Sequence, residues 1–334
     1  MIRVNFIIEN FKALKYLGCS TAAMQIAEVM KKDVEIKINS NERGFDIVHA
    51  HTFGPVAIYH TIKDKNAIKI VSAHSTPSIN KNNIISGGWK IWNLIYSKIY
   101  NRFDYVLAVS NFSVEELKRI GIKKKMFVIE NGVNRNKFKY DSKRAKKFRE
   151  QNDLEKNDFV VLNVAQVTPR KGVYDFIKVA KLMPDAKFIW IGGFPYKFAS
   201  ADYFNLKKIT KMNARLRNLK FLGFVPDIVG AYSASDVLFT PSFAETFGLT
   251  VIEAGACRLP VVARDLRVFR ELFGDNIKYG SNCKEFAEVL KKFKNKDFRN
   301  RQSKKMYKIS EKYDMKVIAN KLFNLYKRLV KNEI

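Results

Sequence analysis

The sequence predicts an α/β protein with two Rossmann-like, doubly wound domains. Three observations lead to this fold class: the chain has 334 residues, 47% of them are hydrophobic, and short apolar runs alternate with helical patterns along it. A chain of this length suggests about two domains. Alternating strands and helices are typical of parallel sheets that helices cover on both faces.

Apolar runs of strand length recur in both halves of the chain. In the first half we expect strands at residues 3–8, 34–38, 46–50, 67–73, 105–109 and 126–130. In the second half we expect them at residues 158–164, 186–191, 218–222, 236–240 and 260–263. A helix or a turn follows each run, and the chain beyond Cys283 has a helical pattern.

A basic segment separates the two predicted domains. Residues 134–158 are rich in lysine and arginine and lack a strong apolar period, so we place the domain boundary within them. The first predicted domain spans residues 1–138, and the second spans residues 139–312. A last helix is predicted at 313–334, and its apolar spacing suits packing against a hydrophobic surface.

The segment from Glu245 to Glu253 carries the most specific chemical signal. An apolar strand precedes it, and a helix is predicted to open beyond Gly248. The first amides of that helix, at the positive end of its dipole, suit a diphosphate. Glu253 lies one turn inside the helix, where it can accept hydrogen bonds from a ribose diol, and Glu245 on the loop can face a sugar. Together these features predict a nucleotide-sugar site.

This pattern closely resembles the retaining nucleotide-sugar glycosyltransferases of family 4, whose signature is Glu-x7-Glu followed by an apolar stretch and a Pro-Val-Val strand, here Pro260 to Val262. Residues 163–172 resemble the family's phosphate-binding Arg-x4-Lys-Gly loop. Lys171 and Gly172 fit that loop, but Gln166 stands where most members have arginine. Other segments match the family in order, at residues 46–51, 72–74, 109–110, 128–133 and 221–223.

The resemblance implies a GT-B architecture, in which two Rossmann-like domains face each other across a cleft and the last helix returns to the first domain. It also implies retention by front-face attack, assisted by the leaving phosphate, with no cofactor and no metal ion. In agreement, the sequence lacks the Asp-x-Asp motif of the metal-dependent fold class. The donor is expected to be a nucleotide sugar, first of all a UDP-hexose.

Each candidate residue has an expected role in binding the donor or in catalysis. The donor-binding residues are expected to be Gly18, Gln166, Arg170, Lys171, Phe247, Gly248, Leu249 and Glu253, and the catalytic residues His74 and Glu245. Lys171 and Arg170 would stabilise the departing diphosphate, and Glu253 would hold the ribose. Glu245 and His74 would orient the sugar, because His74 ends a strand at the edge of the sheet where ligands bind.

Some of these residues have a second interpretation. Gly18 stands alone where family members usually carry two glycines, so it is equally consistent with a simple strand-to-helix turn. Arg170 is also consistent with a solvated loop residue. His49 and His51 lie together near the end of one strand, and we expect at most one of them to face the cleft.

Residues 87–103 form the predicted membrane and acceptor helix. Its apolar stripe is expected to contain Trp92, Ile95, Tyr96, Ile99 and Phe103. The expected membrane or acceptor contacts are Trp89, Lys90, Trp92, Lys98 and Arg102. Aromatic residues beside cations suit an interfacial helix, although the stripe is equally consistent with a helix that packs on the first sheet.

The acceptor is predicted from a narrower resemblance. Bacterial enzymes that add glucose or galactose to diacylglycerol or to monoglycosyl-diacylglycerol share the Gln-x-x-Pro-Arg-Lys-Gly loop, here residues 166–172. We therefore expect a glycosyltransferase that moves a hexose to a lipid hydroxyl. The same donor chemistry on a soluble sugar or polysaccharide is the alternative. A basic nucleic-acid-binding protein would explain the charge but not Glu245 and Glu253.

Composition restricts partner and compartment. A formal net charge of +29, from 61 basic and 32 acidic residues, favours an anionic membrane surface, and we expect no nucleic acid because no nucleic-acid motif is present. Three cysteines without paired or metal-ligand spacing suit a reducing compartment. With no signal peptide and no apolar run of about 20 residues, we expect a peripheral protein on the cytoplasmic face of the membrane.

Overall fold

The computed structural model describes residues 1–9, 18–51, 54–77, 89–194, 202–213 and 216–333. These residues form two compact units. Unit 1 contains the described residues of Met1–Lys81, Ser86–Asn134 and Tyr313–Ile334, and unit 2 contains those of Arg135–Lys312. The chain therefore leaves unit 1 after Asn134, a little before the expected boundary at 138, and returns to it at Tyr313.

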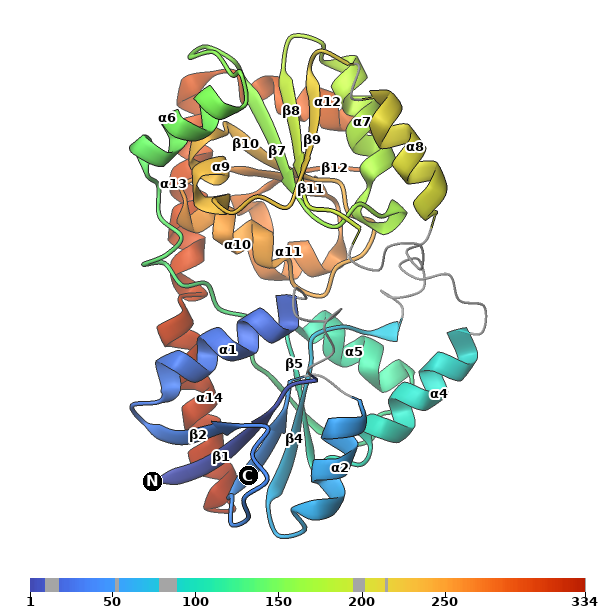
Figure 1. The fold of residues 1–334 in the computed structure, drawn as a ribbon, viewed down its shortest axis with the longest axis vertical. Helices are drawn as coiled ribbons and strands as arrows, with labels where there is room; N and C mark the ends of the chain where they lie inside the picture. Colours follow the sequence, from blue (N-terminus) through green and yellow to red (C-terminus); the bar gives the residue numbers. More distant parts are fainter. Residues whose placement is uncertain (10–17, 52–53, 78–88, 195–201, 214–215, 334) are drawn as a thin grey trace. The chain divides into compact units, whose positions relative to one another are not determined.

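Unit 1 is built on parallel strands in the order β2-β1-β3-β4-β5-β6. These strands are β1 (Ile2–Ile7), β2 (Val34–Ile38), β3 (Ile47–Ala50), β4 (Ile68–Ala73), β5 (Tyr105–Ala108) and β6 (Lys125–Val128). The helices that flank them are α1 (Gly18–Met30), α2 (Pro55–Lys63), α4 (Trp89–Tyr100), α5 (Asn111–Arg119) and α14 (Met315–Val330) (Figure 1). Chain order reverses between β1 and β3, which pair directly in the sheet.

Unit 2 is built on a second parallel sheet, in the order β12-β11-β10-β7-β8-β9. Its strands are β7 (Val160–Val164), β8 (Lys187–Ile191), β9 (Leu219–Gly223), β10 (Val237–Thr240), β11 (Val261–Arg264) and β12 (Lys278–Gly280). Its helices are α6 (Ser142–Gln151), α7 (Val173–Leu182), α8 (Tyr203–Asn213), α9 (Ile228–Ala234), α10 (Leu249–Ala256), α11 (Arg267–Phe273), α12 (Cys283–Lys292) and α13 (Lys296–Lys312). Chain order reverses between β7 and β10.

Both sheets confirm the predicted Rossmann-like fold class. The predicted strands form in the expected order, and among the described residues the structure adds one more, β12, a strand of 3 residues that pairs with β11 at the edge of its sheet. Three residues are too few to establish a hydrophobic period, so this strand could not be predicted from the sequence.

The central strands are apolar because helices cover both faces of each sheet. All four residues of β3 and of β10 are buried. In unit 2, Phe176 of α7 packs edge-on against Phe188 and Trp190 of β8, with ring centroids 5.3 and 5.2 Å apart. Trp190 also donates a hydrogen bond from Nε1 to the Ala165 carbonyl at 2.9 Å, so this polar atom is satisfied inside the core.

Helix α14 completes unit 1 with residues from the far end of the sequence. The backbone enters it through two hydrogen bonds with Val133, from Val133 N to Tyr313 O at 2.8 Å and from Met315 N to Val133 O at 2.9 Å. Asp314 then caps the helix by accepting from Lys316 N. Figure 1 shows α14 beside α1, and its buried Tyr326 reaches the sheet.

Candidate functional site

The predicted donor-site residues of unit 2 come together where the chain order of the sheet reverses. Ligands of open α/β sheets bind beyond the carboxyl ends of the strands at such a point. The loop after β7 contains Arg170 and Lys171, in a short 3-10 turn, and the loop after β10 contains Glu245. Because β7 and β10 are neighbours, side chains far apart in the sequence meet at this edge.

Gly172 fixes the approach of these two loops. It adopts a left-handed conformation with φ 75°, and a Cβ at this position would lie 2.3 Å from the Pro241 carbonyl oxygen. Phe243 N donates a hydrogen bond to the Arg170 carbonyl at 2.7 Å, which ties the loops together a second time. Any other residue at 172 would push the loops apart.

Arg170, Lys171 and Glu245 form a buried charge cluster. Lys171 Nζ lies 2.5 Å from Glu245 Oε1, and Arg170 Nη1 lies 3.8 Å from Glu245 Oε2. Arg170 also donates to the Ala244 carbonyl at 2.8 Å. Two cations around one carboxylate leave a net charge of 2 − 1 = +1, which suits an anionic ligand. Arg170 is 8% exposed, so it is not a solvated loop residue.

The cluster keeps Glu245 ionised. Burial alone would raise the pKa of Glu245, but the charges of Lys171 and Arg170 and hydrogen bonds from Lys171 and Ser242 hold this pKa below its usual value. Burial lowers the pKa of Lys171, and Glu245 opposes that shift. A carboxylate that remains charged beside two cations is a rigid hydrogen-bond acceptor at neutral pH.

Glu253 lies in a different environment, one turn into α10. Tyr232 of α9 donates a hydrogen bond from its hydroxyl to Glu253 Oε2 at 2.8 Å. Burial raises the pKa of Glu253 to about 7, although Tyr232 and Lys137 act against the shift. Tyr232 was not predicted, because it lies on the preceding helix and nothing in its local pattern points to Glu253.

The two helices that open at this edge start on glycine. Gly248 begins α10 in a left-handed conformation with φ 95°, and a Cβ there would lie 2.8 Å from the Phe269 ring. Neither α7 nor α10 has a side-chain cap within the described residues. Other helices do carry such caps, among them Ser110, Asp141, Asp227, Asn282 and Asp314. The first amides of α7 and α10 are thus left without a side-chain acceptor, as anion binding requires.

The remaining predicted donor residues differ in what their side chains do. Phe247 is 1% exposed and packs against Phe273, so its side chain belongs to the core, whereas Leu249 is half-buried at the start of α10. Gln166 Oε1 is buried with no hydrogen-bond partner within the described residues. Gly18 opens α1, but side-chain packing around residues 18–21 lies outside the described part of the structure.

Two polar residues near Gln166 were not predicted. Asn163 Nδ2 and Thr168 Oγ1 are also buried without a hydrogen-bond partner in the described part of the chain. Both lie on β7 or its loop, at the edge that carries Arg170. Asn163 is the one polar residue in the apolar run Val160–Val164, and this position could have identified it as a candidate from the sequence.

In unit 1, three histidines gather near the carboxyl edge of β3 and β4. Rings of His49 and His51 lie 4.0 Å apart, and those of His51 and His74 lie 5.9 Å apart and stacked. His49 and His51 line the same small cavity, because residues two positions apart on a strand share a face. Burial lowers the pKa of His49 to about 3 and that of His74 to about 4, while Asn131 opposes the shift at His74.

Helix α4 corrects the predicted apolar stripe. Tyr96, Tyr100 and Phe103 are buried in the core of unit 1, and Ile99 packs against them. Trp92 and Ile95 are not part of that face: they are exposed, together with Ile91 and Leu94. Hydrogen bonds from Ser97 and Asn101 to the Gly121 carbonyl, both 3.0 Å, hold the helix in this orientation. The helix therefore has two apolar faces, one packed and one exposed.

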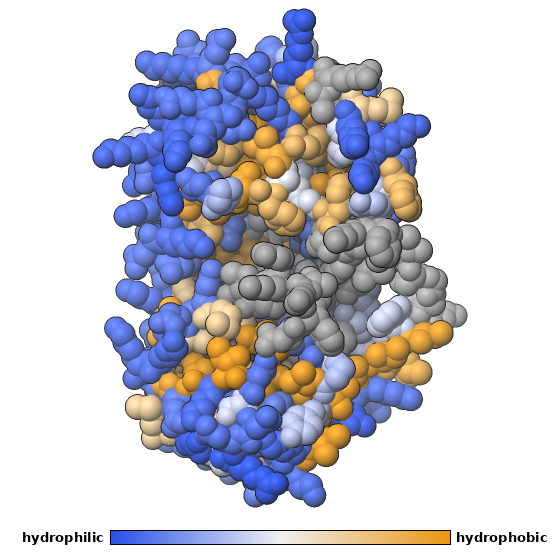
Figure 2. Space-filling view, viewed as in Figure 1, coloured by the Kyte–Doolittle hydropathy of each residue, from blue (hydrophilic) through white to orange (hydrophobic). Residues whose placement is uncertain are grey.

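The exposed apolar face of α4 lies beside basic residues. Figure 2 shows hydrophobic side chains gathered over α4. Lys98 and Arg102 are exposed on or just after the same helix. The side chains of Trp89 and Lys90 lie outside the described part of the structure. Within the described residues, no helix is both long and apolar enough to cross a bilayer.

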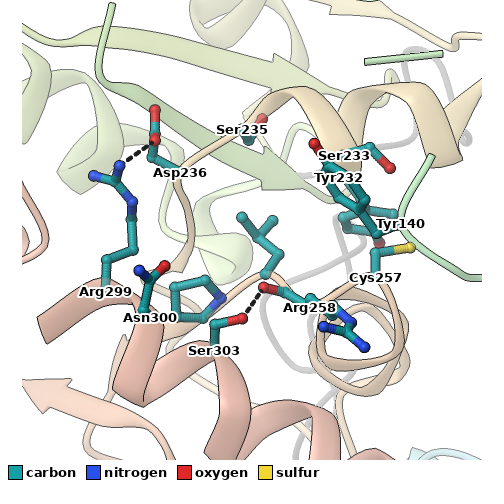
Figure 3. A pocket seen from close by; sticks show the side chains of 12 residues that line it. Tyr140, Tyr232, Ser233, Ser235, Asp236, Cys257, Arg258, Arg299, Asn300 and Ser303 are labelled. Carbon is teal, nitrogen blue, oxygen red and sulfur yellow. Dashed lines mark hydrogen bonds and ion pairs between the residues drawn. The ribbon is translucent and has the colours of Figure 1, made fainter. Parts of the chain in front are cut away.

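Unit 2 also contains a pocket that lies away from the loops of the candidate site. Among the described residues, no group of three or more His, Cys, Asp or Glu side chains could hold a metal ion. A polar pocket of about 100 Å³ lies at the amino ends of β10 and β11, away from the loops that carry the site (Figure 3). Arg299 pairs with Asp236 there at 3.3 Å.

Comparisons with known proteins identify the family of both halves of the chain. The family model described as Glycosyl transferases group 1 matches residues 144–312, and the model described as Glycosyltransferase Family 4 matches residues 30–137. The chain is 30% identical over 300 residues to the processive diacylglycerol alpha-glucosyltransferase of Acholeplasma laidlawii, covering 86% of each chain. It is 28% identical over 304 residues to the alpha-galactosylglucosyldiacylglycerol synthase of Streptococcus pneumoniae, covering 86% of this chain and 79% of that one.

A solved structure shares the fold of both units. Anabaena Alr3699/HepE in complex with UDP-glucose matches with a TM-score of 0.81 and 21% identity, over 98% of this chain and 100% of that chain.

Proposed function

Because the chain belongs to the group 1 glycosyltransferases, we propose that it is a retaining enzyme that moves glucose or galactose from UDP to a hydroxyl group of a membrane glycerolipid or glycolipid. The observation that carries the donor half is the buried cluster of Arg170, Lys171 and Glu245 at the reversal point of the unit 2 sheet. The acceptor half rests on the exposed apolar face of α4 and on the two diacylglycerol-modifying relatives.

The charge cluster and the uncapped helix N-termini would stabilise the leaving group, which is the nucleoside diphosphate. Arg170, Lys171 and the first amides of α10 would stabilise negative charge on the diphosphate as the bond from the sugar C1 to its oxygen breaks. Glu253 would accept hydrogen bonds from the ribose diol, and Glu245 with His74 would orient the sugar. The acceptor oxygen would form the new bond to C1 on the same face, while its proton passes to the leaving phosphate. This chemistry requires no metal ion.

The exposed face of α4 would place the enzyme on a lipid surface. Ile91, Trp92 and Leu94 are 65%, 45% and 55% exposed, which is unusual for large apolar side chains that lie next to one another. Lys98 and Arg102 nearby would attract anionic headgroups, with a contribution of about 1 kcal/mol for each cation near the surface. We propose a peripheral location on the cytoplasmic face of a membrane.

The reaction is tested by incubating the enzyme with a panel of nucleotide sugars and three kinds of acceptor: diacylglycerol, monoglycosyl-diacylglycerol and soluble sugars. Chromatography of the products should show a glycolipid formed from UDP-glucose or UDP-galactose. Transfer to soluble sugars alone would reject the lipid acceptor and keep the donor chemistry. An inverted anomeric configuration in the product would reject retention.

The membrane surface has its own test. Replacing Ile91, Trp92 and Leu94 together with Ser should weaken sedimentation with anionic vesicles without changing UDP affinity. The matched control replaces Phe204 and Met212 of α8, which are 76% and 59% exposed, and it should sediment like the parent. High salt should remove the part of binding that depends on Lys98 and Arg102. Parental sedimentation of the triple variant would show that α4 is not the lipid contact.

A further inference from the structure

Two histidines of unit 1 differ sharply although they lie two residues apart. His49 is fully buried and uses both ring nitrogens: Nδ1 lies 2.5 Å from the Tyr326 hydroxyl, and Nε2 lies 2.8 Å from the Ser72 hydroxyl. His51 is 4% exposed, yet neither of its ring nitrogens has a hydrogen-bond partner within the described residues. A buried polar group without a partner is costly, so its presence needs an explanation.

His51 also lies where ligands of such sheets bind. It follows β3, next to the point between β1 and β3 at which chain order reverses. With His74, Ser72 and Asn131 it lines a cavity of about 30 Å³. Its ring is held in place between Phe6, 4.4 Å away, and the stacked ring of His74. The side chain is therefore fixed in position at the wall of this cavity, and the described residues leave both of its ring nitrogens without a partner.

The chemistry of the ring limits what that group can be. Burial and the neighbouring His49 and His74 keep the pKa of His51 well below its usual value, so the ring is neutral, with one donor and one acceptor nitrogen. A phosphate or carboxylate offers only acceptors, and an ammonium offers only donors. A hydroxyl offers both. The two nitrogens point away from each other, and the cavity has room for a water molecule at one of them.

We propose that His51 binds a hydroxyl group of a sugar substrate, beside the position expected for His74, and so helps to determine which sugar is accepted. This inference rests on the proposed function, because it needs a sugar to be held at the carboxyl edge of the unit 1 sheet. The hydroxyl belongs either to the donor hexose or to the glycosyl headgroup of a lipid acceptor, and kinetics distinguishes the two.

The test compares matched substitutions, His51→Phe and His49→Phe. His51→Phe removes only unpartnered nitrogens, so it should keep or raise the melting temperature and keep UDP affinity, while turnover falls at least 10-fold. His49→Phe leaves the buried Tyr326 and Ser72 hydroxyls without their partner, so it should lower the melting temperature. His51→Gln, which restores a donor and an acceptor, should recover part of the turnover.

The KM values of the variants for the two substrates show which substrate carries the hydroxyl. A KM increase for the UDP-hexose assigns the hydroxyl to the donor, and an increase for the glycolipid assigns it to the acceptor. Parental turnover in His51→Phe would overturn the inference and leave a buried water as the partner. If His51→Phe fails to fold, His51→Gln and His51→Asn decide: the inference fails if Asn, with the shorter reach, matches Gln in turnover.

A spectroscopic measurement keeps this inference distinct from the proposed function. The chain has only 4 histidines, so their ring nitrogens can be resolved by ¹⁵N NMR in the parent protein. Adding UDP-glucose, UDP-galactose or free hexose should shift the His51 nitrogens and leave those of His49 unchanged. If the parent transfers no sugar, the proposed function fails, whereas a His51 resonance that no sugar perturbs overturns this inference.

Discussion

The same place in the two sheets carries opposite chemistry. At the reversal point of unit 2, Arg170, Lys171 and Glu245 form a charged cluster in which the cations pair with the carboxylate; we call this the donor edge. At the reversal point of unit 1, His49, His51 and His74 are neutral, the first two buried and the third half-buried; we call this the histidine edge. In sheets of this kind, topology determines where a ligand can bind. The side chains at that place determine whether binding uses charge or neutral hydrogen bonds.

The largest expected effect follows from removing Glu245, the carboxylate at the centre of the donor edge. Glu245→Ala would leave Lys171 and Arg170 as uncompensated buried cations, and we expect a loss of about 3 to 5 kcal/mol in the stability of unit 2. Trp190, in the core of unit 2, reports unfolding by fluorescence once Trp89 and Trp92 are replaced with Phe. The double variant Lys171→Ala/Glu245→Ala should lose less than Glu245→Ala alone. Equal losses would mean that the cluster is solvated.

The next effect concerns affinity. Lys171→Ala and Glu253→Ala should each weaken UDP binding by about 1.5 to 3 kcal/mol, the value of a charge-assisted hydrogen bond. Calorimetry with UDP measures this, and Arg258→Ala, at the pocket on the other end of the sheet, serves as the control. Parental affinity should also fall below pH 7, because Glu253 then becomes protonated. If neither variant changes affinity, the donor edge has been assigned wrongly.

The two edges should respond oppositely to pH. His49 titrates near pH 3 when folded and near 6.5 when unfolded, so its contribution to stability is present above 6.5 and is lost as pH falls toward 3. Glu253 titrates near 7 when folded and near 4.5 when unfolded, so its contribution is present below 4.5 and is lost as pH rises toward 7. Between pH 5 and 6.5, Glu253→Gln should steepen the rise of stability with pH by about 1.4 kcal/mol per unit. Urea titrations of parent and variant with identical slopes would contradict this.

Removal of metal ions is expected to leave the transfer rate unchanged. Because side-chain cations and helix amides supply the stabilisation of the leaving group, transfer should continue at the parental rate after exhaustive chelation with EDTA. A loss of turnover that Mg²⁺ or Mn²⁺ restores would show that the donor edge alone does not neutralise the diphosphate.

Much of the fold could be predicted because strands buried on both faces leave continuous apolar runs, as in β7 and β10. The positions of Glu245 and Glu253 could be predicted from spacing: the seven residues between them place one on the loop and the other on the first turns of α10. The resemblance then supplied the partner loop that contains Lys171. No local pattern could have supplied the 2.8 Å contact between Tyr232 and Glu253, because it depends on how α9 and α10 pack.

The helix α4 and His51 show what periodicity cannot decide. Residues Ile91 to Phe103 are apolar on more than one face, so a helical period alone cannot tell which face packs, and Trp92 was assigned to the same face as Tyr96. His49 and His51 lie on the same face of the strand and are both buried. Among the described residues, only His49 has hydrogen-bond partners, which come from β4 and α14. Whether a buried polar atom has a hydrogen-bond partner depends on tertiary contacts, which a local sequence pattern does not show.

The return of the chain through α14 has a consequence for the order in which the protein is made. The described residues of unit 2 lie in one stretch, Arg135–Lys312, so its sheet is complete as soon as that stretch has left the ribosome. Unit 1 begins first but needs residues from Tyr313 onward, and His49 lacks its Tyr326 partner until then. Domains usually finish folding in the order of synthesis. Here the N-terminal unit finishes last, and a nascent chain that stalls before α14 carries an unfinished histidine edge beside a finished donor edge.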